Sequence, residues 1–250
     1  MSRAEPRAEA HTRPERQPRY EPAERSRPTP ETRAMPVEPG RPGVGVYSGR
    51  PRVSQQQEQQ RIYQDQRRAS VYRDHLAEQT QRLQQESLRL REQRRMQQYR
   101  FEQDYIRRLE LQRQRLAAER NYEDDPYYYA PYTYRYLRGG QYYETNQYGA
   151  SLLRQAVNYG YQEGVRAGQA DRLDGWAPDY LNSYAYQDAN YGYTGLYVNQ
   201  ADYNYYFRQG FQRGYNDGYY NRFQYGTYVN GNYSILGTLL TNILGLQTLP

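Results

Sequence analysis

The chain has 250 residues, a net charge of +6 and a hydrophobic fraction of 36% that includes 33 tyrosines. A mean hydropathy of −1.25 excludes a large aliphatic core, so any folded domain must be built around aromatic side chains. Cysteine is absent, which excludes disulfides and thiolate metal sites, and no run of 18 apolar residues predicts a membrane span.

Residues 1–53 are dense in proline, arginine and glutamate. Such a composition cannot bury enough apolar surface to offset the entropy lost on ordering. We therefore predict a disordered, partly polyproline-like arm. A solvated tail is the favoured interpretation, and contact of its arginines with nucleic acid or another anionic surface is the alternative.

Residues 54–125 contain no proline or glycine and are rich in glutamine, arginine, glutamate and leucine, which predicts one long solvent-exposed helix. Apolar residues recur every seven positions at Ile62, Ala69, Leu76, Leu83 and Leu90. The positions three residues later are mostly polar: Asp65, Tyr72, Gln79 and Glu86. One apolar residue per heptad is weaker than a true coiled-coil seam, so a spacer and one strand of a loose coiled coil both remain open. After Leu90 the spacing shifts, which we interpret as a stutter in a continuous helix.

Residues 126–250 form the predicted Tyr/Gly-rich domain, with eight arginines and eight acidic residues. Tyrosines alternate on both sides of Gly139-Gly140, and a second alternating stretch surrounds Asn230-Gly231. Alternation around a Gly-Gly or Asn-Gly pair is typical of a hairpin turn. The sequence therefore predicts a mainly α fold with one or two β-hairpins.

An internal repeat occupies the centre of this domain. Residues 158–171 read NYGYQEGVRAGQAD and residues 204–217 read NYYFRQGFQRGYND, with matched positions 46 residues apart. Two trios of glycines recur at every fourth residue within the repeat region: Gly160, Gly164 and Gly168, and Gly210, Gly214 and Gly218. We predict two helices, from about 151 to 174 and from about 200 to 221, packed on each other through these glycine faces. The alternative is that the glycines mark loops.

Asp171 and Asp217 lie at matched positions near the ends of the two predicted helices. Because the helix dipole disfavours a carboxylate there, we expect each to have an arginine or tyrosine hydroxyl partner, and Arg213 is at the right spacing to pair with Asp217. Trp176 is expected to fill the junction after the first helix. Ser234 is the predicted N-cap of an aliphatic closing helix over the last residues of the chain.

The segments YGYQEGVRAGQADR, DANYGY and YYFRQGFQRGYNDGY resemble uncharacterised small bacterial proteins that are frequent in Acidobacteria. The resemblance covers about residues 150–222 and implies the same pair of glycine-spaced helices. It also implies an exported or cell-envelope location, although the first residues lack the apolar region of a signal peptide.

The sequence carries no pattern that predicts catalysis. His11 and His75 both lie outside the predicted domain, and no phosphate loop, nucleophile elbow or dinucleotide fingerprint is present. We therefore expect no catalytic, cofactor-binding or metal-binding residues. The leading hypothesis is a non-enzymatic structural or scaffolding protein that binds itself or another protein through the Tyr/Gly-rich domain. The alternative is a nucleic-acid-binding protein that uses arginine with tyrosine stacking, against which stands the neutral charge of the domain.

Overall fold

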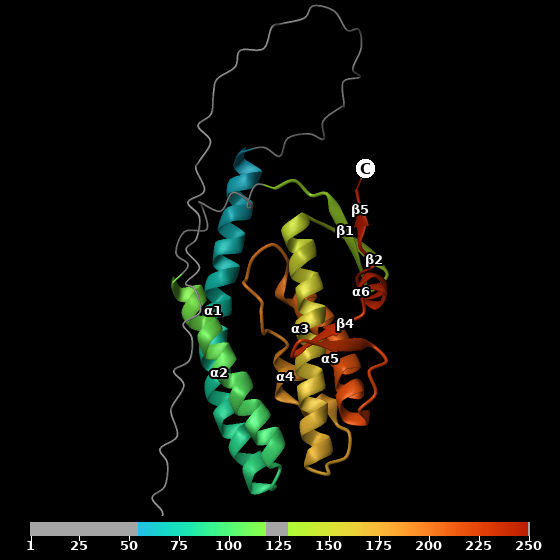
Figure 1. Ribbon diagram of the computed structural model, residues 1–250. Helices are drawn as coiled ribbons and strands as arrows, with labels where there is room; N and C mark the ends of the chain where they lie inside the picture. Colours follow the sequence, from blue (N-terminus) through green and yellow to red (C-terminus); the bar gives the residue numbers. More distant parts are fainter. Residues whose placement is uncertain (1–54, 119–129, 250) are drawn as a thin grey trace, which may run out of the picture. The chain divides into compact units, whose positions relative to one another are not determined.

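The computed structural model describes residues 55–118 and 130–249, and these residues lie in the same structural unit (Figure 1). The predicted arm at 1–53 and the last part of the predicted long helix lie outside the described residues. The helices are α1 (Gln55–Glu92), α2 (Met96–Ala118), α3 (Gln147–Leu173), a 3₁₀ turn (Tyr180–Asn182), α4 (Tyr184–Asp188), α5 (Gln200–Tyr220) and α6 (Gly237–Leu244). The strands are β1 (Tyr134–Arg138), β2 (Gln141–Thr145), β3 (Gly226–Val229), β4 (Asn232–Ile235) and β5 (Gln247–Thr248). The prediction of a mainly helical fold with small antiparallel hairpins is confirmed.

Helices α3 and α5 form the centre of the unit and lie side by side (Figure 1). A methyl group added at Gly160, Gly164 or Gly168 would overlap a backbone carbonyl oxygen of α5, and one added at Gly210, Gly214 or Gly218 would overlap a carbonyl oxygen of α3. The residue numbers of the contacted carbonyl groups rise in the same direction as those of the glycines, so the two helices run parallel. Their backbones are in direct contact, which no residue larger than glycine permits at these six positions.

The register of this contact differs from that of the sequence repeat. Gly160 faces the carbonyl oxygen of Phe207, and Gly210 faces that of Val157. The two contacts are equivalent if Gly160 corresponds to Gly210 and Val157 to Phe207, so structurally equivalent positions are 50 residues apart. The sequence repeat, by contrast, has an offset of 46. The difference of four residues is about one helical turn, and the shift brings all three glycines of each helix into the contact.

The core is aromatic, as the composition predicts. Nine of the largest fully buried side chains are tyrosines or phenylalanines: Tyr72, Tyr105, Tyr161, Tyr193, Tyr203, Tyr206, Tyr215, Phe207 and Phe211. The hydroxyl groups of these tyrosines bond to polar partners. For example, Tyr203 and Tyr206 donate to the carbonyl oxygens of Tyr191 and Leu137, at 2.6 and 2.5 Å. A buried hydroxyl without such a partner would cost about 1–3 kcal/mol, so the hydrogen bonds are what make a tyrosine core possible.

The segment predicted as one continuous exposed helix is two antiparallel helices, α1 and α2, joined at residues 93–95 (Figure 1). This corrects the prediction for this segment. Arg94 adopts a left-handed conformation with φ of 62°, which an arginine accepts only at a cost of about 1 kcal/mol. The apolar residues that recur every seven positions are buried at the centre of α1, since Leu76 and Leu83 are at most 1% exposed. The shift in spacing after Leu90 therefore marks a reversal of the chain.

Two hairpins flank the helix pair, at the turns that the sequence indicates. In β1–β2 the turn is Gly139-Gly140, and in β3–β4 it is Asn230-Gly231, all with positive φ as a two-residue hairpin turn requires. β5 pairs with β1, so the first hairpin becomes a three-stranded antiparallel sheet of order β2-β1-β5. The predicted N-cap, Ser234, is instead a residue of β4, and α6 begins after Leu236 without a side-chain cap.

Candidate functional site

The two aspartates of the repeat accept hydrogen bonds from tyrosines of the opposite helix. Tyr215 of α5 donates to Asp171 at 2.5 Å, and Tyr161 of α3 donates to Asp217 at 2.7 Å. Asp217 also accepts from the backbone N–H groups of residues 224 and 225, which holds the chain as it leaves α5. The suggested pairing of Arg213 with Asp217 is wrong: Arg213 donates to the backbone and side chain of Gln209.

Asp171 also connects α3 to the turn between α1 and α2. The guanidinium of Arg95 donates to Asp171 at 2.5 Å and lies over the ring of Trp176, 4.4 Å from its centroid. Trp176, which was expected to fill the junction after the first helix, follows α3 directly but is 39% exposed and lies under Arg95 at the surface. Asp174 accepts from the N–H groups of Gln97 and Gln98 at 2.9 Å and thereby caps the first turn of α2. These contacts position the break that divides the predicted long helix.

A buried carboxylate with two arginines joins α2 to α3. Glu163 is fully buried and accepts from Arg108 of α2 and from Arg166 of α3. Burial raises the pKa of the Glu163 carboxyl, and the two neighbouring guanidinium groups oppose that rise. With Glu163 ionised, the group of three side chains carries one net positive charge near the surface.

Glu102 of α2 lies in a less favourable environment. It is 4% exposed, and its Oε2 atom has no hydrogen-bond partner among the described residues. Burial, followed by the nearby charge of Glu86, raises the pKa of Glu102 to about 8. At neutral pH this carboxyl group is therefore largely protonated.

The polar positions next to the seam of α1 contact the tyrosine-rich domain. Tyr72 donates to the carbonyl oxygen of Asn190 at 2.9 Å, and Gln79 accepts from Tyr184 at 2.8 Å. On the same face His75 lines a polar pocket of about 380 Å³ together with Asp188. His75 was expected outside the folded domain, and its position in this pocket corrects that expectation. Tyr72, His75 and Gln79 are three and four residues apart, and this spacing in the sequence places them on one face of a helix.

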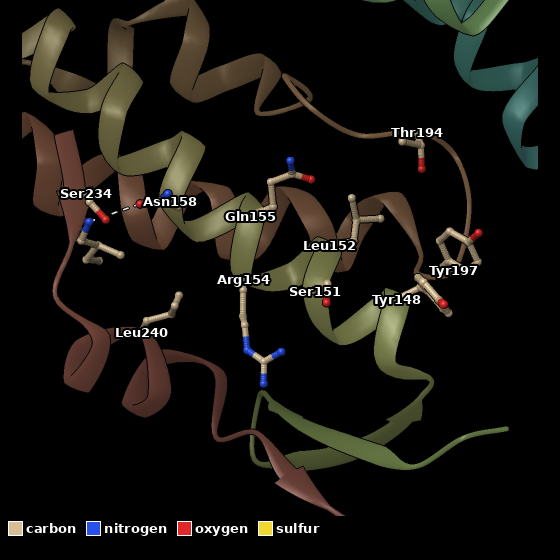
Figure 2. Close-up of a pocket in the computed structure, with 11 residues that line it drawn as sticks. Tyr148, Ser151, Leu152, Arg154, Gln155, Asn158, Thr194, Tyr197, Ser234 and Leu240 are labelled. Atoms are coloured by element: carbon tan, nitrogen blue, oxygen red, sulfur yellow. Dashed lines mark hydrogen bonds between the residues drawn. The ribbon is translucent and has the colours of Figure 1, made fainter. Parts of the chain in front are cut away.

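Two pockets lie along the outward face of α3. The first, of about 480 Å³, is bordered by β4, α6 and the segment from Thr194 to Tyr197. Figure 2 shows Arg154 extending from α3 toward the sheet of β1, where its guanidinium lies 5.9 Å from the ring centroid of Tyr134, whereas Gln155 extends to the other side of the helix. Asn158 accepts from the N–H group of Ile235 at 3.2 Å and closes one end of this pocket.

The second pocket, which we call the α2–α3 pocket, has a volume of about 290 Å³. Its lining includes Arg108, Gln112 and Arg115 of α2, Gln155 and Tyr159 of α3, and Tyr191, Gly192, Tyr193 and Thr194 from the segment before α5. It shares Gln155 and Thr194 with the first pocket, so the two are neighbours. None of its described lining residues is acidic.

Comparison with protein-family models, curated protein sequences and solved structures found no match to this chain. Within residues 55–118 and 130–249, no three histidine, cysteine or acidic side chains group in a way that could hold a metal ion. Of the helices described, none has the length and apolar character to cross a bilayer.

Only some of the residues that the structure brings together were predicted from the sequence. All six glycines lie at the α3–α5 contact, and Asp171 and Asp217 both lie toward its C-terminal end, because the two helices run parallel. Sequence reasoning missed Arg95, Asp174 and Glu163. Each has a partner far away in the chain, and Glu163 also has a local one, Arg166. Arg95 and Asp171, for example, are 76 residues apart, and no local pattern signals such a pair.

Proposed function

We propose that this chain is a non-enzymatic structural or scaffolding protein that self-associates through its C-terminal half. The buried carboxylates support a structural role, because they join elements of the fold. Asp171, Asp188, Asp202 and Asp217 each accept a tyrosine hydroxyl, and Glu163 accepts from two arginines. These groups are used for stability and are not held ready for a substrate.

The glycine faces are not the surface for self-association in this proposal. They are buried between α3 and α5 of the same chain, where the two backbones touch. A second molecule must therefore contact another surface of the domain.

The observation that carries the proposal is an exposed aromatic patch beside an open strand edge. We call it the hairpin patch, and it consists of Phe223, Tyr228 and Tyr233, in which the ring of Tyr233 lies against the other two rings, together with the neighbouring Val229 of β3. Tyr228 and Val229 are 56% and 60% exposed, and both belong to β3, which in the described residues pairs only with β4. An unpaired edge with apolar side chains is a template for strand pairing, and tyrosine is enriched at protein contacts. The equal numbers of arginines and acids in residues 126–250 also reduce repulsion between copies.

The test is the molar mass of the full-length protein in solution, measured by light scattering after size-exclusion chromatography over a range of concentrations. We expect the double variant Tyr228→Gln, Val229→Gln to shift the protein toward monomer. The matched control is Tyr63→Gln, Val71→Gln on α1, because these residues are 67% and 61% exposed. A wild-type protein that is monomeric at all concentrations, or an equal loss of mass in both variants, would contradict the proposal.

A further inference from the structure

The α2–α3 pocket combines positive charge with aromatic rings. Arg108, Gln112 and Arg115 are spaced four and three residues apart along α2, so their side chains project from the same face. Arg108 shares the charge of Glu163 with Arg166, which does not line the pocket, so these three side chains place one net positive charge beside it, and Arg115 adds another on the lining. Since no described lining residue is acidic, the pocket favours a negatively charged ligand.

The aromatic side of the pocket is formed by Tyr159 and Tyr191. Their ring centroids are 5.1 Å apart, with an angle of 50° between the planes. The guanidinium of Arg108 lies 5.6 Å from the centroid of the Tyr191 ring. Both tyrosines are half-buried, so part of each ring faces the pocket. Rings beside guanidinium groups suit a ligand that has a planar part and an anionic part.

The backbone of the pocket is held in place by partly buried hydrogen bonds. Gln112 accepts from the N–H group of Gly192 at 2.8 Å and donates to the carbonyl oxygen of Tyr193 at 2.9 Å. Gly192 has φ of +89°, and a methyl group there would overlap the ring of Tyr159. The segment can therefore lie directly against that ring. A site arranged before the ligand arrives loses less entropy on binding.

We propose that the α2–α3 pocket binds one nucleotide unit, with the base against the rings of Tyr159 and Tyr191 and the phosphate at Arg115 and Arg108. A volume of about 290 Å³ is close to the lower limit of ligand pockets and suits one such unit. The same chemistry occurs in a free nucleotide and in a nucleotide of a single strand. The pocket shares no residue with the hairpin patch, so this proposal does not depend on self-association.

The experiment titrates the full-length protein with AMP and, separately, with a fluorescein-labelled oligodeoxyadenylate of about 12 nucleotides, a length that covers a typical single-strand site. Binding is measured by calorimetry for AMP and by fluorescence anisotropy for the oligonucleotide. Saturable binding of AMP identifies a free nucleotide as the ligand, and binding of the oligonucleotide alone identifies a strand. Both outcomes support the proposal if binding responds to the variants below, and a protein that binds neither probe overturns it.

The variants separate the pocket from general electrostatic attraction. We expect Arg115→Gln to weaken binding about 10-fold, because it removes a charge-assisted contact to phosphate. Arg100→Gln removes the same charge from an exposed position of α2 outside the pocket and is expected to change affinity less than about twofold. Equal losses in the two variants would overturn the proposal.

Two further variants examine the ring. Tyr159→Leu is expected to weaken binding about 10-fold and Tyr159→Phe about twofold or less, because phenylalanine retains the stacking surface. Thermal melts of each variant show whether the fold is kept. If Tyr159→Leu melts below the assay temperature, the comparison of Arg115→Gln with Arg100→Gln decides alone. Competition by polyglutamate as strong as that by the oligonucleotide would indicate an acidic peptide site and would overturn the proposal.

Discussion

The α3–α5 pair and the α1–α2 hairpin bury their contact faces in opposite ways. In the α3–α5 pair, glycines bring one backbone against the other, and flanking aromatic rings fill the sides. The α1–α2 hairpin is instead held by side chains: Leu83 is part of the buried core, and Tyr105 and Gln79 form hydrogen bonds with the tyrosine-rich domain. The first contact depends on the absence of side chains and the second on their presence.

This difference determines how each contact responds to substitution. A backbone cannot move aside for an added methyl group without moving the whole helix, so the glycine contact tolerates almost no change. A contact between side chains leaves a cavity when one is shortened, and its neighbours partly relax around the space. The predictions below start with the largest expected effect.

The glycine contact is broken by one methyl group. We expect Gly164→Ala to lower the free energy of unfolding by about 3–5 kcal/mol, because the new Cβ would overlap the carbonyl oxygen of Phe211. Chemical denaturation followed by circular dichroism measures the change. Gly237→Ala is the control, because no described atom lies within 4 Å of its added Cβ and its φ is not positive.

The control is expected to change the free energy of unfolding by less than about 0.5 kcal/mol, as exposed substitutions usually do. Equal losses for Gly164→Ala and Gly237→Ala would show that the two backbones are not in contact.

The contact of the α1–α2 hairpin is weakened by removing one leucine side chain. Leu83 is fully buried, so Leu83→Ala is expected to cost about 2–4 kcal/mol through lost burial and a residual cavity. Leu88 is on the same helix but is 54% exposed, and Leu88→Ala should cost less than about 0.5 kcal/mol. Thermal unfolding of both variants measures the difference. Similar melting temperatures would indicate that α1 stands apart from the rest of the unit, as an exposed spacer would.

The buried Glu102 of α2 makes the stability of the α1–α2 hairpin sensitive to pH, and the expected change in the free energy of unfolding is smaller. Its ordinary pKa is 4.5 and its pKa in the folded protein is about 8, so the folded state holds the proton more strongly. The stability that the protonated carboxyl contributes is fully present below pH 4.5, decreases as the pH rises, and is lost above about pH 8.

Glu102→Gln carries no titrating group and should flatten this dependence, raising stability at about pH 9 by about 1–2 kcal/mol relative to the wild type. Melting temperatures measured across the pH range test this, with the exposed Glu92→Gln as control. A Glu102→Gln curve parallel to that of the wild type would contradict the prediction.

Several parts of the fold follow from local sequence. Gly139-Gly140 and Asn230-Gly231 indicate both hairpins, because only residues that accept positive φ fit such turns. The range of about 200 to 221 matches α5, whose last residue is Tyr220 and whose cap, Asn221, is left-handed. The aromatic core follows from the composition, since tyrosine is the main apolar residue.

The candidate site was only partly predictable. Spacing of four residues places the glycines on one face of each helix, but it cannot determine whether the partner is the other helix or a second chain. The α2–α3 pocket joins Arg115, Tyr159 and Tyr191, which belong to three separate segments, so no local motif contains it. The net charge at this pocket can be counted only when the position of Glu163 beside Arg108 is known.

By itself the sequence determined the helical character, the two hairpin turns, the aromatic core and the glycine faces, because each depends on conformational preferences of neighbouring residues or on composition. Tertiary structure decided where the long helical segment reverses. Nothing at Arg94 predicts a break, and the left-handed residue is tolerated because Asp171 binds Arg95 and Asp174 caps the new helix. It also decided the register of α3 against α5, one turn away from the sequence repeat, because that shift brings all six glycines into the backbone contact.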